Sequence, residues 1–390
     1  MAPSPEILVE IPSPESSPVG ARWWGRALLA VASVAGLVVI LSVTEPRVPP
    51  VDWTRTVGPS GSVNLDSLVA TPDGFALLSG MTTEGVLLWS SADGSTWRSQ
   101  PLQDAPSQLA VVDDGLIAYS VRRGRMIEPT GEGWVEAADS LVFPDEVRSR
   151  QGSGRPSLIG TEDGLLAMSL FGDVWWSGDG TQFDRVVADP DWGPGAELPF
   201  DSVCRPPIRT SPDVPPMVAT DSGLVAMISS NLAEPFGIWP VCEPQLWFSD
   251  DGQTWTDSDS TLGDGAYVFN LGWRDGRFTA VGGFGIGRPA AWTSTDGRAW
   301  EPMAFFTDLE EVDLFTVESG AAGWVVLGRD SEGSETVGWT SSDGLCWNVL
   351  PDSIGGGDAA VSAEHIIVFD RTTYPELWQG STTGGNGACT

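Results

Sequence analysis

The sequence contains no lysine and a single histidine, His365. Its 20 basic residues are therefore all arginine, and 53 acidic residues give a net charge of −33 at pH 7. A surface this acidic repels nucleic acid, which excludes nucleic acid as a general partner. One imidazole also argues against zinc sites built on several histidines and against catalytic dyads that need a second histidine. We expect no metal and no cofactor.

The first 50 residues differ in composition from the rest. Residues 1–21 are rich in Pro, Ser and Glu without a sustained apolar period, and predict a disordered cytoplasmic tail. Residues 27–44 are uncharged and mostly apolar, about 27 Å long as a helix, with Trp23 and Trp24 where an interfacial aromatic belt belongs. Residues 22–44 therefore predict a single transmembrane helix that acts as a signal anchor, with a cleaved signal peptide as the alternative. Residues 45–50 predict a Pro-rich linker.

The membrane prediction sets the expected location. Arg22 and Arg26 flank the near side of the apolar segment, so the N-terminus is expected in the cytoplasm and the remainder of the chain outside the cell membrane. The expected membrane contact is made through residues 27–44.

A nine-residue pattern, W-x-S-x-D-G-x-x-[W/F], occurs five times, and an aromatic residue lies four positions before and four positions after each Asp. We call each copy a repeated turn. Its defining residues are Asp93, Gly94 and Trp97; Asp179, Gly180 and Phe183; Asp251, Gly252 and Trp255; Asp296, Gly297 and Trp300; and Asp343, Gly344 and Trp347. A degenerate copy lies at residues 130–134. A self-similar period of this kind predicts a repeat architecture.

The spacing of the turns predicts the fold. Successive turns are 39 to 47 residues apart, apart from one step of 72, and short apolar runs bounded by Asp-Gly pairs lie between them. Four-stranded propeller blades have this period. We expect an all-β fold: a seven-bladed β-propeller of four-stranded antiparallel blades over 51–385, preceded by the transmembrane helix. Blades are expected near 65–102, 107–144, 155–188, 201–259, 265–304, 311–351 and 358–381, with 51–57 as the closing strand of the last blade and 382–390 as a Gly-rich tail.

The chemistry of the repeated turn indicates a structural role. Asp accepts backbone N–H groups within its own turn, and Gly supplies a positive φ. A three-residue loop at residues 92–94 would place Trp89 directly opposite Trp97, with Ser91 facing Ser95.

The repeated turn resembles the Asp-box, or BNR, repeat of sialidase-like β-propellers, written S-x-D-x-G-x-T-W. Copies such as SADGSTW and SDDGQTW are one residue shorter between the Asp and the aromatic residue. The resemblance implies a turn between the third and fourth strands of a blade, on the face away from the ligand site. Because that family includes glycosidases, receptors and assembly factors, the resemblance implies no single function.

Four cysteines allow three disulfide pairings. In the blade arrangement Cys204 and Cys242 fall in two long loops of one blade and are expected to form one bridge. Cys346 and Cys389 are expected to form the second and to hold the C-terminus. A position outside the cytoplasm permits both bonds.

Catalytic candidates are few. The resemblance implies that a sialidase would need an Arg cluster, a Tyr–Glu pair and an Asp acid. The Arg-Ile-Pro motif of that family is matched only weakly, by residues 47–49. The sequence contains three tyrosines that could act as the nucleophile, Tyr119, Tyr267 and Tyr374. The acidic stretch 257–264 lacks the Gly and Glu that a calcium loop needs. We therefore assign no catalytic residue.

Arginine placement gives the binding hypothesis. Six arginines and two tryptophans fall in loops on the predicted ligand face: Arg122, Arg123, Arg125, Arg148, Arg150, Arg155, Trp192 and Trp239. They would bind an anionic glycan or an acidic segment of a protein; local charge balancing is the alternative. The expected function is a membrane-anchored, non-catalytic binding or scaffolding module for a protein or glycan partner at the cell surface, and the alternative is a surface glycosidase of sialidase-like fold.

Overall fold

The computed structural model describes residues 52–56, 65–82, 85–102, 106, 108–112, 115–119, 124–130, 133–141, 157–161, 164–168, 174–178, 183–186, 217–220, 223–229, 244–257, 262–263, 266–284, 288–307, 309, 312–330, 335–351, 354, 356–369 and 377–381. The predicted tail at 1–21, the linker at 45–50 and the C-terminal tail at 382–390 lie outside these ranges.

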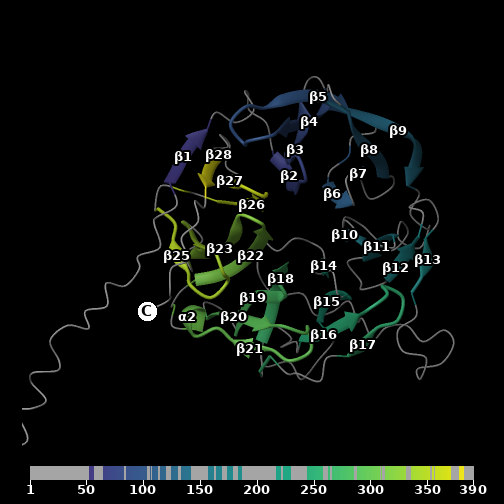
Figure 1. Ribbon diagram of the computed structural model, residues 1–390. Helices are drawn as coiled ribbons and strands as arrows, with labels where there is room; N and C mark the ends of the chain where they lie inside the picture. Colours follow the sequence, from purple (N-terminus) through teal and green to yellow (C-terminus); the bar gives the residue numbers. More distant parts are fainter. Residues whose placement is uncertain are drawn as a thin grey trace, which may run out of the picture. The chain divides into compact units, whose positions relative to one another are not determined.

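The described strands form seven four-stranded antiparallel sheets, which we call blades one to seven (Figure 1). Blades one to three consist of β2 (Leu65–Thr71), β3 (Gly74–Thr82), β4 (Gly85–Ser91) and β5 (Arg98–Leu102); β6 (Gln108–Val112), β7 (Gly115–Tyr119), β8 (Gly124–Thr130) and β9 (Gly133–Leu141); and β10 (Ser157–Thr161), β11 (Gly164–Met168), β12 (Val174–Ser177) and β13 (Asp184–Arg185).

Blades four to six consist of β14 (Met217–Thr220), β15 (Gly223–Ser229), β16 (Pro244–Ser249) and β17 (Thr256–Asp257); β18 (Ala266–Arg274), β19 (Arg277–Phe284), β20 (Pro289–Ser294) and β21 (Glu301–Pro302); and β22 (Val312–Gly320), β23 (Gly323–Asp330), β24 (Thr336–Ser341) and β25 (Asn348–Val349). A short helix, α2 (Ala304–Thr307), lies between blades five and six. Blade seven consists of β26 (Asp358–Val361), β27 (His365–Phe369), β28 (Leu377–Ser381) and β1 (Asp52–Thr56).

The blades form a closed ring. The first strand of each blade contacts the first strand of the next, from β2 through β6, β10, β14, β18 and β22 to β26, and β26 contacts β2. These first strands are the innermost strands of the ring. The architecture is an all-β propeller, in which no strand of an inner edge is left without a neighbour.

The predicted fold class needs a correction, because it placed one transmembrane helix, residues 22–44, before the propeller. No helix within the described ranges is long and apolar enough to cross a membrane. Residues 22–44 themselves lie outside those ranges. The described residues form an all-β propeller.

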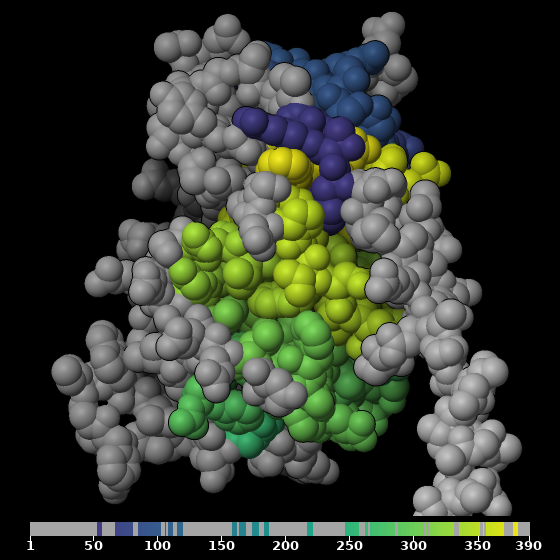
Figure 2. Space-filling model, turned by 90° about the vertical axis from the view of Figure 1, so that its left-hand side faces the viewer, coloured from purple at the N-terminus to yellow at the C-terminus, as the bar shows by residue number. Residues whose placement is uncertain are grey.

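The N-terminal and C-terminal strands meet in blade seven. β1 pairs antiparallel with β28, so that Thr54 lies opposite Gln379. Figure 2 shows this purple N-terminal strand lying against the yellow C-terminal strands. It is the pairing that the sequence predicts for residues 51–57. The Gln379 side chain also donates to the backbone oxygen of Asp93 at 2.7 Å, which links blade seven to the repeated turn of blade one.

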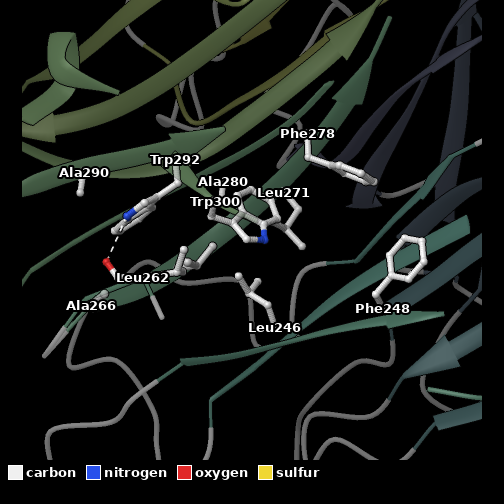
Figure 3. Close-up of a cluster of buried hydrophobic side chains, with 11 residues drawn as sticks. Leu246, Phe248, Leu262, Ala266, Leu271, Phe278, Ala280, Ala290, Trp292 and Trp300 are labelled. Atoms are coloured by element: carbon white, nitrogen blue, oxygen red, sulfur yellow. Dashed lines mark hydrogen bonds between the residues drawn. The ribbon is translucent and has the colours of Figure 1, made fainter. Parts of the chain in front are cut away.

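The hydrophobic core lies between neighbouring blades. One cluster joins Leu246 and Phe248 of blade four to Phe278, Trp292 and Trp300 of blade five (Figure 3). The indole of Trp292 is buried there and donates to the backbone oxygen of Leu262 at 3.2 Å, drawn as the dashed line in Figure 3. Corresponding clusters lie at the other junctions, including the one between blades seven and one. Because each blade buries one face on each neighbour, the ring stabilises itself by burial of apolar area.

The repeated turn has the expected Asp and Gly geometry but a different strand register. Trp89 lies opposite Ser99, not Trp97, and the same offset of ten residues recurs at Trp247, Trp292 and Trp339. The prediction of a Trp89–Trp97 pair is therefore wrong. The physical reason is that the Asp carboxylate binds the two amides that would otherwise continue the ladder, so the turn is longer than three residues.

Candidate functional site

Most residues of the predicted binding surface lie outside the described ranges, namely Arg122, Arg123, Arg148, Arg150, Arg155, Trp192 and Trp239. Arg125 lies in β8, where its backbone pairs with Ala118 of β7 and Ser140 of β9. Cys204, Cys242 and Cys389 also lie outside the described residues, whereas Cys346 is disulfide-bonded.

The aspartate carboxylates of the described repeated turns accept hydrogen bonds from backbone amides of their own turns. An oxygen of Asp93 accepts the backbone N–H groups of Ser95 and Thr96 at 2.8 and 3.1 Å. Asp251, Asp296 and Asp343 accept the equivalent pairs of amides. Asp179 and Gly180 lie outside the described residues.

These hydrogen bonds change the acidity of the turn carboxyls. The side-chain and backbone donors of Ser95 lower the pKa of Asp93, and backbone donors lower that of Asp296. At Asp251 and Asp343 burial acts to raise the pKa, but the backbone hydrogen bonds outweigh it and the net direction is downward. A carboxylate held ionised by its own turn is a poor acid or base, which agrees with a structural role.

The glycine and aromatic positions complete the turn. Gly94, Gly252, Gly297 and Gly344 have φ of 78°, 70°, 71° and 73°, a region that favours glycine. The indole nitrogens of Trp97, Trp255 and Trp300 donate to the oxygens of Gly94, Gly252 and Gly297 at 3.0–3.2 Å. Phe183, the aromatic residue of the blade-three turn, is buried.

The innermost strands carry polar side chains that do not repeat. Tyr267 is the second residue of β18 and Asp313 the second residue of β22. The first and third strands of a blade run in the same direction, and the repeated turn follows the third strand. Both residues therefore lie at the end of the ring opposite the repeated turns.

Tyr267 and Asp313 interact across the junction of blades five and six. Burial, the charge of Asp313 and a hydrogen bond to Asp313 all raise the pKa of Tyr267 above its ordinary value. The phenol is therefore neutral and donates to the carboxylate. The Tyr267 ring also packs edge-on against Phe269, with 4.9 Å between ring centroids. A nucleophilic tyrosine needs the opposite shift, because the phenolate is the reactive form.

A second pair lies at the junction of blades six and seven. Burial and the charge of Asp358 raise the pKa of Glu318 to about 8. Glu318 is on β22 and Asp358 begins β26, and these two innermost strands are in contact. Two neighbouring carboxyls, one protonated and one ionised, form a polar pair of the kind that performs acid–base chemistry in enzymes.

Sequence reasoning did not single out Asp313, Glu318 or Asp358. Each is one of 53 acidic residues, and nothing in its local sequence marks it. The signal that was available is position, because Glu318 lies within the first apolar run of a predicted blade, where a charged side chain is unusual, and Asp313 and Asp358 lie directly before such runs. Among the described residues no group of His, Cys, Asp and Glu has the arrangement of a metal site.

Comparisons with known proteins identify the fold alone. No family model matches the sequence, and no curated protein matches it either. Among solved structures, the WD40 repeats of RRP9 align with a TM-score of 0.51 and 11% identity, over 85% of this chain and 97% of that one. Hydrazine synthase of Kuenenia stuttgartiensis aligns with a TM-score of 0.51 and 9% identity, over 82% and 96%. At these identities the likeness shows a β-propeller and says nothing about activity.

Proposed function

We propose that the propeller is a non-catalytic binding or scaffolding module, and that it holds a protein partner at the end of the ring opposite the repeated turns. The observation that carries this proposal is the Tyr267–Asp313 pair. It offers a neutral phenol and an ionised carboxylate on rigid strands, which suits recognition of amide and guanidinium groups. The raised pKa of Tyr267 disfavours the phenolate that a tyrosine nucleophile requires.

Two further expectations belong to this proposal. The disulfide of Cys346 supports a location outside the cytoplasm, where such bonds persist. The hydrogen bonds of Asp93, Asp251, Asp296 and Asp343 support a relation to Asp-box propellers, in which the turn is structural and the opposite face binds ligands.

The test is a comparison of partners captured by cross-linking to the full chain. The variant Tyr267→Phe/Asp313→Asn should lose the partner that the wild type captures, and circular dichroism should show an unchanged fold. Asp275→Asn, in the exposed β18–β19 turn at the other end of the ring, is the matched control and should keep it. Equal capture by all three proteins would refute a binding role for this end.

The arginine surface is tested separately. An Arg122→Ala/Arg123→Ala/Arg125→Ala variant should weaken capture of an acidic partner, and the loss should grow smaller as salt is raised, because screening weakens the same contacts in the wild type. Unchanged capture at low salt would remove these arginines from the proposed site.

A second candidate function is glycoside hydrolysis, and the specific observation in its favour is the Glu318–Asp358 pair. A protonated Glu beside an ionised Asp matches the acid and the nucleophile or base of glycosidases. The test is release of the aryl group from a panel of aryl glycosides by the purified chain. Activity that Glu318→Gln abolishes would favour the enzyme over the binding module.

A further inference from the structure

The described residues expose three large apolar side chains: Leu345 and Val349 belong to blade six, and Phe305 belongs to α2, which contacts β20 of blade five and whose Phe306 packs on Trp347 of blade six. Phe305, Leu345 and Val349 are 39%, 51% and 66% exposed. Phe305 precedes Phe306, whose ring lies 5.1 Å from Trp347 and 5.5 Å from Trp339 between centroids. Val349 lies opposite Trp339 in the strand register, and Leu345 belongs to the same repeated turn as Trp347. We call Phe305, Leu345, Trp347 and Val349 the blade-six edge.

The blade-six edge also contains a buried donor without an acceptor. In the turns of blades one, four and five, the indole N–H donates to the glycine oxygen of its own turn at 3.0–3.2 Å. The side chain of Trp347 is 9% exposed, yet its Nε1 has no hydrogen-bond partner. A buried unsatisfied N–H costs about 1–3 kcal/mol, so the edge favours a ligand that supplies a carbonyl oxygen.

Cys346, which lies between Leu345 and Trp347 in the sequence, is covalently linked to another part of the chain. It is disulfide-bonded, and the other three cysteines lie outside the described residues. In the sequence Cys242 comes two residues before β16, and β16 begins at the end of the ring opposite the repeated turn that contains Cys346. Cys204 belongs to the segment that leads into β14 of the same blade, and blade five separates blade four from blade six.

Cys389 is placed differently. β28 is the third strand of blade seven, so the chain leaves it at Ser381 on the same end of the ring as the repeated turns. Blade seven packs directly on blade six. The eight residues from Ser381 to Cys389 span up to about 26 Å when extended, which reaches across one blade.

We propose that the C-terminal segment, residues 382–390, docks on the blade-six edge, where it is fixed by a Cys346–Cys389 disulfide and accepts the hydrogen bond of Trp347 Nε1 through a backbone carbonyl. β25 is the outermost strand of its sheet in the described structure, so its outer side is open to such a segment. The docked segment shields Leu345 and Val349. Reduction by dithiothreitol, which is oxidised to its cyclic disulfide while two cysteine thiols form, releases the segment and uncovers the edge.

Peptide mapping of the full chain without reduction tests the covalent link. The expected result is a linked pair of peptides that contain Cys346 and Cys389 and separate on reduction. A link from Cys346 to Cys204 or Cys242 would overturn the proposal.

Hydrogen exchange tests the docking. In a full-chain Cys389→Ser variant, amides of residues 345–349 should exchange about tenfold faster than in the wild type, while those of residues 297–300 in blade five keep their rates. Trp347→Phe, which keeps the disulfide and removes the N–H, should give a smaller increase. The matched control is Cys204→Ser/Cys242→Ser, which should leave residues 345–349 unchanged. Unaltered exchange in the Cys389→Ser variant would show that the segment is linked but not docked. That result also refutes the proposal, and the mapping result on the wild type stands whether or not a variant folds.

Discussion

The pKa values of carboxyl groups shift in opposite directions in the repeated turns and on the innermost strands. In the four turns that the structure describes in full, the aspartate accepts two backbone N–H groups and its pKa falls. On the innermost strands, Glu318 is half-buried beside Asp358, and its pKa rises to about 8. The difference lies in the surroundings of the carboxylate. A turn supplies amide donors that stabilise the ionised carboxylate, whereas the inner strand desolvates the carboxylate and destabilises its ionised form.

This difference separates the structural part of the molecule from the part available for function. A turn that satisfies its own carboxylate has no capacity left for a ligand, and its recurrence in five blades marks it as an element of the architecture. The junction pairs Tyr267–Asp313 and Glu318–Asp358 occur once each, so ring assembly does not account for them. Groups with perturbed pKa values in a shared environment are candidates for function.

The largest expected effect comes from removing a turn tryptophan. Trp255 is 1% exposed and packs between blades three and four. Trp255→Ala should lower the free energy of unfolding by about 3–5 kcal/mol, because it removes a large buried side chain and leaves a cavity. Urea denaturation followed by circular dichroism measures the change. A loss below about 1 kcal/mol would mean that the turn aromatic is not a structural element.

A matched pair isolates the hydrogen bond. Trp255→Phe loses the bond to the Gly252 oxygen, whereas Trp347→Phe, made in the Cys389→Ser background that releases the docked C-terminal segment, has no such bond to lose. The first substitution should therefore cost about 1 kcal/mol more than the second. Equal costs in that background would show that the hydrogen bond of Trp255 contributes nothing to stability.

The next effect concerns Glu318 and has the opposite pH dependence to the turns. Since its pKa is raised in the folded state, its contribution favours folding below the unfolded pKa and is lost as pH rises from about 4.5 to about 8. The turn aspartates contribute above their ordinary pKa of 3.8 and lose that contribution as pH falls below it. Glu318→Gln stays neutral, so between pH 5 and pH 8 it should gain about 1–3 kcal/mol relative to the wild type, with partial exposure taken into account.

Urea denaturation at a series of pH values measures this gain. If the free energies of unfolding of the wild type and of Glu318→Gln change in parallel from pH 5 to pH 8, Glu318 ionises in the folded protein without a loss of stability. Asp275→Asn is the control, because Asp275 is exposed and its substitution should leave the slope unchanged.

The fold was largely predictable from sequence because the repeated turn is local. Asp93 and Gly94 lie next to the groups they bind, so the spacing of the turns predicts the turn and the blade period. The register was not predictable from the same pattern. The hydrogen bonds from Ser95 and Thr96 to Asp93 lengthen the loop, and Trp89 moves from Trp97 to Ser99.

The candidate site was not predictable in the same way. Tyr267 and Asp313 are 46 positions apart, and Glu318 and Asp358 are 40 apart. They meet because neighbouring blades bring their first strands together, which depends on the packing of whole sheets. The predicted arginines were chosen by clustering in sequence, and most of them lie outside the described residues.

A smaller effect is expected at the Tyr267–Asp313 pair. Asp313→Asn removes the charge and the ionic acceptor that raise the pKa of Tyr267, so this pKa should fall towards the ordinary value of about 10. Burial still acts on the phenol, so the fall is partial. Phenolate absorbance during an alkaline titration measures it, and Tyr267→Phe identifies which of the three tyrosines has moved. An unchanged titration would show that Asp313 does not contact the phenol.

A further effect is expected at the seam between blades seven and one. Gln379 of β28 donates from Nε2 to the Asp93 oxygen at 2.7 Å and lies 3.3 Å from His365 Nδ1, so one side chain joins the blade-one turn to blade seven. Gln379→Ala should cost about 0.5–1.5 kcal/mol and speed amide exchange in β1, because the closing strand pairs beside it. Gln253→Ala, at an exposed side chain in the blade-four turn, should change neither quantity. Faster exchange in β1 without faster exchange in the blade-one turn would place the effect of Gln379 within its own sheet and not at the seam between the blades.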